Sequence, residues 1–279
     1  MSPLAFTFIT FAASIVAGVC GSILGLGGGI VVIPVLTLLL GVDIRFAIGA
    51  SIVSVIATSS GAAAAYVREH MTNLRVAMLL ELGTTSGALT GAFLGGLIAG
   101  RWLFLIFSVV MGYSALAMFQ KRHSDPSVPV PPDPIADRLK LHGEYFDEQA
   151  GEVVRYRVTH TPLGLALMYV AGMVSGLLGI GSGSLKVPAM DLAMHLPIKV
   201  SSTTSNFMIG VTGAASAGVY FARGDINPFI AGPVAAGVLI GATLGSRLLG
   251  RLKSSWVRVA FVVVLLWVCL QMAYKGIVG

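Results

Sequence analysis

A glycine-rich stretch inside apolar sequence constrains this chain more than any other feature. The stretch GSILGLGGGIVVIP covers residues 21–34, and its five glycines fall within residues 21–29. Glycine at this density breaks a helix. Non-helical backbone at membrane depth is tolerated only where protein buries it or where it lines a cavity. The apolar runs on both sides therefore have to enclose the break among other helices.

The composition identifies lipid as the solvent of these apolar runs. Of 279 residues, 56% are hydrophobic and only 11% are charged, whereas soluble domains carry about 25% charged residues. A membrane-spanning helix needs about 20 apolar residues, and we predict an all-α polytopic membrane protein. Long apolar segments cover residues 4–24, 45–66, 74–99, 102–120, 162–179, 200–221, 228–250 and 255–277, and shorter ones cover 30–41 and 185–196.

The charges and cysteines exclude several other classes of protein. In a membrane protein, the net charge of +6 indicates basic loops, and we expect no nucleic-acid partner. No lysine or arginine precedes Arg45, so the first apolar segment lacks the basic start of a signal peptide and should remain as a span. Cys20 and Cys269 are expected to be reduced, packed thiols. Asp191 and His195 are two ligands, too few for a metal site, and no cofactor is expected.

Residues 121–160 differ from the rest because they are polar and rich in proline. The first part is expected to be an extended spacer. The second part reads LKLHGEYF, then DEQAG, then EVVRYRV, which predicts two short strands around a turn, a β-hairpin. The segment separates residues 1–120 from residues 161–279, so we predict two membrane units joined by a solvated linker. A role in docking or regulation is the alternative for this linker.

The glycine-rich stretch has a second copy 154 residues later. GVCGSILGLGGGIVVIPVL begins at Gly18, and GMVSGLLGIGSGSLKVPAM begins at Gly172. The same displacement aligns the rest of each unit without a gap, which is unlike a chance match, and each unit is therefore one structural repeat. The matched pairs include Gly25 with Gly179, Gly27 with Gly181, Gly29 with Gly183, Pro34 with Pro188, Ser51 with Ser205, Thr58 with Thr212, Tyr66 with Tyr220 and Trp102 with Trp256.

The distribution of basic residues favours two repeats of inverted topology. If each glycine-rich loop and its flanking helices form a re-entrant hairpin, the second repeat is upside down, and parallel repeats are the alternative. The inverted arrangement satisfies the positive-inside rule better, with a cytoplasmic linker and both termini outside. It places Arg68, Arg75, Lys121, Arg122, Lys199, Arg251, Lys253 and Arg258 on the linker side and Arg45, Arg101, Arg223 and Lys275 on the other.

Inverted repeats with broken helices are typical of secondary transporters. The start of each half-helix exposes free N–H groups and a positive dipole end, which attract anions. Two such starts that enter from opposite sides would enclose one anionic substrate near the membrane midplane.

The repeated motifs GLGGGIVVIPVL and GIGSGSLKVPAM, with GASIVSVIATSS and SSTTSNFMIGVTG, resemble the sulfite exporter TauE/SafE family of membrane proteins. The resemblance covers essentially the whole chain apart from the linker. It implies a transporter, with export as the favoured direction, that moves sulfite, organosulfonates or related small sulfur-containing anions across the cell inner membrane. The implied partners are this anion and the lipid bilayer, and a homodimer stays open.

The candidate site combines backbone N–H groups with polar side chains on both repeats. Lys186 aligns with Val32, so the fold does not require a cation there, and a lysine at membrane depth is a functional candidate. Snorkelling to the surface or a structural pair with Asp191 is the alternative for Lys186. The residues expected to bind the substrate are Gly27, Gly28, Gly29, Ser51, Thr58, Gly181, Ser182, Gly183, Ser184, Lys186, Ser205 and Asn206.

Glu81 is the candidate for coupling transport to an ion, because it lies inside the 74–99 segment and aligns with Ala235. It is expected to carry a proton or to pair with Lys186, and a carboxylate close to the interface is the structural alternative. For the serine, threonine and asparagine residues, packing between helices is the competing interpretation.

Other functions fit the sequence less well. An intramembrane serine protease needs an embedded serine and histidine pair, and His195 lies only at the edge of an apolar segment. GLGGGI lacks the strand, helix and acidic residue of a dinucleotide site, so we expect no enzyme. A membrane scaffold that recruits a partner through its hairpin is the second hypothesis, but a scaffold does not need broken helices in the bilayer.

Overall fold

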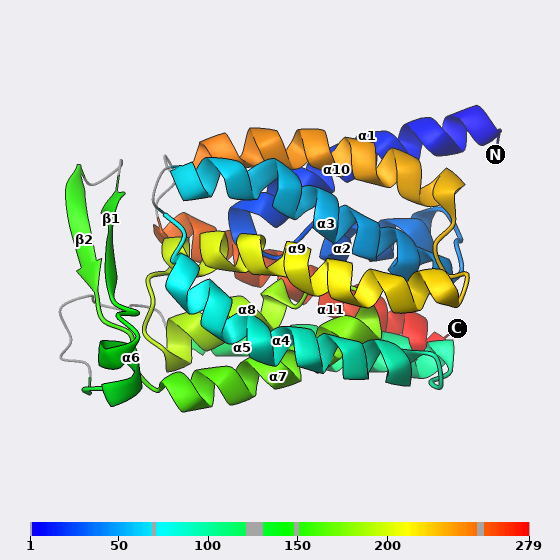
Figure 1. The fold of residues 1–279 in the computed structure, drawn as a ribbon. Coiled ribbons are helices and arrows are strands. Elements are labelled where there is room, and N and C mark those ends of the chain that lie inside the picture. The colour runs from blue at the N-terminus through cyan, green and yellow to red at the C-terminus, as the bar shows by residue number, and fades with distance from the viewer. Residues whose placement is uncertain (1, 69–70, 121–130, 148–150, 250–253, 279) are drawn as a thin grey trace.

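The structure is a computed structural model that describes residues 2–68, 71–120, 131–147, 151–249 and 254–278. Its elements form a helical bundle with a small hairpin at one end (Figure 1). In chain order they are α1 Pro3–Leu24, α2 Gly29–Pro34, η1 Val35–Leu39, α3 Ile44–Arg68, α4 Leu74–Gly95, α5 Gly100–Gln120, α6 Pro134–Arg138, β1 Gly143–Asp147, β2 Glu152–Tyr156, α7 Thr161–Leu178, α8 Gly183–Pro188, η2 Ala189–Ala193, α9 Ile198–Ala222, α10 Pro228–Leu249 and α11 Ser254–Val278.

The helices meet the expectation of a multi-pass membrane protein. Within the described residues, five helices are long and apolar enough to cross a membrane: Pro3–Leu24, Ile44–Ala62, Leu74–Gly95, Thr161–Leu178 and Pro228–Leu248. The other expected long segments coincide with α5, α9 and α11. Large apolar side chains cover the outside of the bundle; Leu97 is 85% exposed and Phe229 is 87% exposed. Such an apolar exterior suits contact with lipid.

The helices of the two repeats pack against each other in exchanged pairs. α1 packs on α10 and α4 packs on α7, while α3 packs on α9 and α5 on α11. Small residues allow close approach: a Cβ atom at Gly87 would overlap the carbonyl oxygen of Tyr169, and one at Gly241 would overlap that of Ile15. Because Gly87 and Gly241 are matched across the repeat, the same device holds both exchanged pairs.

Both glycine-rich stretches break a helix in the same way. α1 ends before Gly25, and α7 ends before Gly179, with φ values of 69° and 68° at these glycines. A second left-handed residue follows in each loop, Gly27 and Gly181, and this conformation is nearly free of strain only in glycine. The loops differ at the next position, where Ser182 is also left-handed with a φ of 59°, whereas its match Gly28 has a φ of −59°. The chain then resumes helical structure at α2 and η1 or at α8 and η2.

The second broken helix returns to the end of the bundle where it began. The N–H group of Thr159, just before α7, donates to the carbonyl oxygen of Met194, just after η2, at 3.3 Å. His160 also contacts the carbonyl oxygen of Ala193 at 3.2 Å. In the first repeat, α1 likewise packs against α2 and η1. Each loop therefore lies inside the bundle, away from the end at which its own helix begins.

Matched helices run in opposite directions along the bundle. In Figure 1, α1 runs from the right end to the left, whereas α7 runs from left to right. The pairs α3 and α9, and α5 and α11, are opposed in the same way (Figure 1). Both chain termini lie at the right end, here named the termini end, and α6 with the hairpin lies at the left end, here named the linker end.

The described part of the linker folds against the linker end. β1 and β2 pair antiparallel, with Tyr145 opposite Val154, which agrees with the expected hairpin. The short helix α6 was not expected from the proline-rich sequence; it forms because the Asp133 carboxylate accepts bonds from the N–H groups of Ile135 and Ala136. The start of the expected spacer, residues 121–130, and the tip of the hairpin, residues 148–150, lie outside the described residues.

Two side chains of the bundle region, Lys199 and Asn73, bind the hairpin and the residue Leu141 before it through three hydrogen bonds. The Lys199 ammonium group at the start of α9 donates to the Asp147 carboxylate at 2.9 Å, and Lys199 is only 1% exposed. Asn73, before α4, donates to the carbonyl oxygen of Leu141 and to the hydroxyl group of Tyr156. The described part of the linker thus packs against the linker end.

Candidate functional site

The two glycine loops meet inside the bundle and are held by a reciprocal pair of hydroxyl groups. Ser51 on α3 donates to the carbonyl oxygen of Gly179 at 2.6 Å. Its repeat partner, Ser205 on α9, donates to the carbonyl oxygen of Gly25 at 2.7 Å. Each repeat therefore binds the end of the broken helix of the other repeat, and both serine hydroxyl hydrogens are committed to this task.

The contact between the loops leaves almost no room for added side chains. A Cβ atom at Gly183 would overlap the carbonyl oxygen of Gly25. Gly27 and Gly181 both face the side chains of Val55 and Ile209. The glycines predicted as site residues are thus brought together, and their first structural role is to let two backbones touch.

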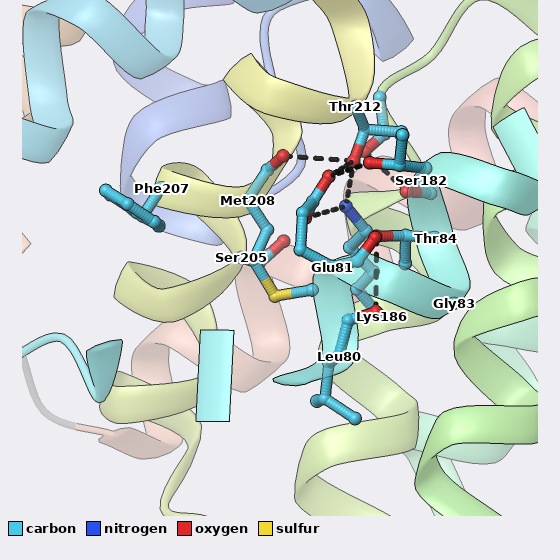
Figure 2. A network of polar contacts seen from close by, with 12 residues as sticks. Leu80, Glu81, Gly83, Thr84, Ser182, Lys186, Ser205, Phe207, Met208 and Thr212 are labelled. Carbon is cyan, nitrogen blue, oxygen red and sulfur yellow. Dashed lines mark hydrogen bonds and ion pairs between the residues drawn. The ribbon is translucent and has the colours of Figure 1, made fainter. Parts of the chain in front are cut away.

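Lys186 lies on α8 beside this crossing and is completely buried. Its ammonium nitrogen donates to the Thr212 hydroxyl oxygen at 2.7 Å and lies 3.8 Å from the Glu81 carboxylate (Figure 2). Lys186 is therefore paired with Glu81 of α4, which was one of the two partners expected from the sequence. Asp191, the other option, is not its ion-pair partner.

The Glu81 side chain extends from α4 to Lys186, and its carboxylate accepts hydrogen bonds from two hydroxyl groups. Thr212 donates to its Oε1 atom at 2.7 Å, and Thr85 donates to the same atom at 2.8 Å. The Glu81 side chain is 13% exposed, while its Oε2 atom is buried and accepts no hydrogen bond from a described residue. The carboxylate is thus held at one oxygen and available at the other.

The matched threonines Thr58 and Thr212 serve different partners. Thr58 accepts a bond from the N–H group of Gly28 at 3.0 Å, so that N–H group is engaged within the protein. Thr212, in the second repeat, accepts instead from Lys186 and donates to Glu81. Thr212 was not among the residues predicted to bind substrate, although the repeat from Thr58 points to it.

Several buried polar groups beside the crossing have no hydrogen-bond partner among the described residues. They are the Ser184 hydroxyl group, two residues before Lys186, the Ser202 hydroxyl group and the Oδ1 atom of Asn206. The amide nitrogen of Asn206 donates to the carbonyl oxygen of Ser22, and the Ser182 hydroxyl group donates to the carbonyl oxygen of Gly181. Unpaired buried polar groups are rare in proteins, so these groups are candidates for contact with a substrate.

The matching position in the first repeat contains no charge. Val32, the partner of Lys186, packs in an apolar cluster with Ala231, Val234 and Val238 of α10. Ala235, the partner of Glu81, belongs to the same helix. The same scaffold therefore occurs twice, once filled with apolar side chains and once with an ion pair.

These features define a class: a multi-pass helical membrane protein with a buried polar centre where two broken helices meet. The family model of the sulfite exporter TauE/SafE matches residues 10–272. The chain therefore belongs to the TauE/SafE family of membrane transporters.

Curated relatives agree with this assignment. "Probable membrane transporter protein YunE" of Bacillus subtilis is 29% identical over 94% of this chain and 96% of its own length. A "Probable membrane transporter protein" of Xylella fastidiosa (strain 9a5c) is 28% identical over 88% of this chain and 86% of its own length. These names indicate a membrane transporter rather than an enzyme. No solved structure matches the chain.

Proposed function

We propose that this protein is a secondary transporter that exports small sulfur-containing anions such as sulfite or organosulfonates across the cell inner membrane. The observation that carries the proposal is the buried Lys186, whose repeat partner is a valine and whose cation the fold does not require. A charged side chain inside a membrane is expensive and marks a functional site by default. The family name supports sulfite as the first substrate to test.

Lys186 retains hydrogen-bonding capacity for a substrate. An ammonium group has three N–H donors, and one is used by Thr212. The Glu81 oxygen at 3.8 Å is an ion-pair partner beyond hydrogen-bond distance. The two remaining donors, the Ser184 hydroxyl group and the N–H groups at the start of α8 are the groups we assign to a sulfite or sulfonate oxygen. We assign Asn206 and the loop glycines Gly27, Gly29 and Gly181 to the surroundings of this substrate.

Protonation of Glu81 would couple the transport of the anion to that of a proton. A substrate anion at Lys186 would be repelled by the neighbouring carboxylate, because like charges in a poorly solvated site interact strongly. Protonation of Glu81 removes the repulsion and leaves Lys186 for the substrate. We therefore assign Glu81 as the coupling residue, with one proton bound for each anion.

The membrane arrangement belongs to the same proposal. We assign residues 1–120 and 161–279 to two repeats of inverted topology, with re-entrant loops and a cytoplasmic linker. The opposed directions of α1 and α7 support this (Figure 1). In a background without Cys20 and Cys269, single cysteines at Arg138 and Leu97 should react with impermeant reagents from opposite sides of the membrane. Reaction from the same side would exclude the inverted arrangement.

The function is tested by binding and transport with one panel of anions. Purified protein should bind one or more of sulfite, thiosulfate, sulfoacetate and taurine more tightly than acetate, and proteoliposomes should take up the bound anion. Lys186→Met should abolish this uptake. The matched control Lys275→Met, at the end of α11, removes the same charge away from the loops and should transport normally. Equal transport by both variants would contradict the proposal.

A further inference from the structure

A charged cavity opens at the termini end, away from Lys186. Its volume is about 220 Å³, and its lining includes Arg45, Ile48, Leu177, Tyr220, Arg223 and Asp225. Pockets for drug-sized ligands occupy about 300–1,000 Å³, so this cavity suits a ligand of a few atoms. Two guanidinium groups face one carboxylate, which leaves the lining with a net positive charge.

Arg223 is fully engaged inside the protein. It binds the Asp225 carboxylate through two nitrogens, at 2.8 Å and 2.7 Å, and donates to the carbonyl oxygen of Ala92 at 2.6 Å. Its guanidinium carbon also lies 4.5 Å from the centre of the Tyr220 ring. Arg223 and Asp225 therefore neutralise each other and form a rigid wall.

Arg45 carries the charge that remains. Its side chain is exposed, and no ion pair or hydrogen bond joins its guanidinium group to a described residue. The backbone N–H group of Arg45 donates to the Asp43 carboxylate at 2.8 Å. The cavity thus presents one guanidinium group that forms no ion pair with a described residue, beside a neutral wall; the nearby Asp43 carboxylate binds the backbone of Arg45 and not its guanidinium group.

The repeat provides an independent observation of what such a cation binds. Arg45 is the second residue of α3, and its repeat partner Lys199 is the second residue of α9. At the linker end, Lys199 is buried and holds a carboxylate, that of Asp147, at 2.9 Å. Each end of the bundle thus has a cationic residue at the second position of the matched helix, Arg45 at the termini end and Lys199 at the linker end. At one end an anionic group of the chain itself is bound, and at the other the cation faces an open cavity.

The cavity also lies in line with the crossing of the glycine loops. Ile48 and Leu177 line it, and a Cβ atom at Gly179 would lie 2.6 Å from a methyl group of Ile48. Ser51, which holds the carbonyl oxygen of Gly179, is six residues beyond Arg45 on the same helix, a rise of about 9 Å. An anion held at Arg45 would therefore be about two helical turns from the loops.

From these contacts we infer that the Arg45 cavity is a second anion site, which captures a small sulfonate or sulfite-like anion at the termini end before or after it occupies the central site. The inference rests on the proposed transport function for its role in the pathway, but the binding at Arg45 stands by itself. At the linker end, the Asp147 carboxylate occupies the corresponding place on the matched cation Lys199.

The test measures charge selectivity at a cysteine inside the cavity. In a background without Cys20 and Cys269, Leu103→Cys is the reporter, and Ile48→Cys is a second one because both replace a larger cavity-lining side chain. Each is treated with an anionic and a cationic methanethiosulfonate reagent of similar size, with methanesulfonate as the protecting anion. The ratio of the two reaction rates reports the local potential, and protection reports occupancy.

Arg45→Gln should lower the anionic-to-cationic rate ratio about ten-fold, within the range that local fields change encounter rates, and should remove protection by methanesulfonate. The control Arg101→Gln removes a charge at the same end, from a side chain that binds the carbonyl oxygen of Gly276, and should keep both. A cysteine at the exposed Leu97 should be insensitive to Arg45. An unchanged ratio and unchanged protection in Arg45→Gln, or no reaction at either reporter, would overturn the inference.

The same reporters separate this inference from the proposed function. Lys186→Met should stop transport and leave protection at the cavity intact. If Lys186→Met transports normally while Arg45→Gln still loses protection, the central assignment fails and the cavity site stands. If protection never depends on Arg45 while Lys186→Met stops transport, the cavity assignment fails and the central site stands.

Discussion

The two repeats build the same crossing of helices but fill it differently. In the first repeat, Val32 packs among Val234 and Val238, and the nearby Thr58 binds the backbone of its own loop. Around the second broken helix, Lys186 of the second repeat and Glu81 of the first repeat occupy the matching positions, and Thr212 binds them both. The centre around Val32 is built from apolar side chains of both repeats in the same way.

The difference between the two centres indicates which side chains the fold requires and which it does not. Replacing a buried ion pair by apolar residues of similar volume is often neutral or stabilising by about 1–4 kcal/mol. An ion pair inside a membrane bundle, at positions matched by Val32 and Ala235 around the first broken helix, is therefore not explained by stability. The predictions below test this difference between the two centres at the glycine loops, at the ion pair of Lys186 and Glu81, and at the serines Ser51 and Ser205.

The largest effect is expected at Gly183. Alanine there would place its Cβ atom on the carbonyl oxygen of Gly25, which is backbone and cannot rotate away. Overpacking a tight core costs about 1–3 kcal/mol or more, and we expect at least about 3 kcal/mol. Gly28→Ala is the matched control, because its Cβ atom would meet side-chain atoms of Val238 at 3.1 Å. Thermal unfolding in detergent measures both, and equal melting temperatures would show that the loops do not touch.

Lys186→Met should have the next largest effect, on affinity and on stability together. Loss of a charge-assisted hydrogen bond costs about 1.5–3 kcal/mol, so anion affinity should fall about ten- to a hundred-fold. Lys186→Arg should keep part of the affinity, since the charge survives while its shape changes. The melting temperature of Lys186→Met should fall as well, because Glu81 loses its cation.

A second change distinguishes the two contributions of Lys186. Glu81→Gln added to Lys186→Met should restore the melting temperature but not the affinity. If the double variant regained affinity, Lys186 would act only by neutralising Glu81. If Lys186→Met lowered the melting temperature and left affinity unchanged, the lysine would be structural, and the hydroxyl and N–H groups would form the site.

The smallest effects are expected at the paired serines. Ser51→Ala and Ser205→Ala each remove one hydroxyl group from a buried carbonyl oxygen of the other repeat, which costs about 1–3 kcal/mol when the carbonyl stays unpaired. Because the contacts are reciprocal, the two variants should lose similar stability. A large difference between their melting temperatures would show that the scaffold itself, and not only its filling, is asymmetric.

The sequence predicted the parts of the fold that repeat. The glycine and proline positions located both helix breaks, because backbone strain and lipid leave few other uses for such residues. The alternation of residues in the linker predicted the hairpin, whereas helix α6 depends on the capping carboxylate of Asp133, a local signal within a proline-rich stretch that was interpreted as extended.

The sequence was less informative about contacts between distant helices. It singled out Lys186 because the repeat partner is apolar, yet it left the lysine with two candidate partners. Glu81 is the partner only because α4 packs beside α9 and α7, which no local pattern specifies. Likewise, the hydroxyl groups of Ser51 and Ser205 were expected to face a substrate, and their bonds to the loops of the opposite repeat depend on the three-dimensional crossing.

The most direct test makes the centre around Lys186 resemble the apolar centre around Val32. The double variant Glu81→Ala/Lys186→Val copies the residues Ala235 and Val32 into the matching positions. We predict that it folds with a melting temperature equal to or above that of the parent protein and that uptake of radiolabelled sulfite, or of the best anion of the panel, falls to the level of empty liposomes. Uptake at the parent rate by this well-folded variant would contradict the claim that the ion pair is retained for transport.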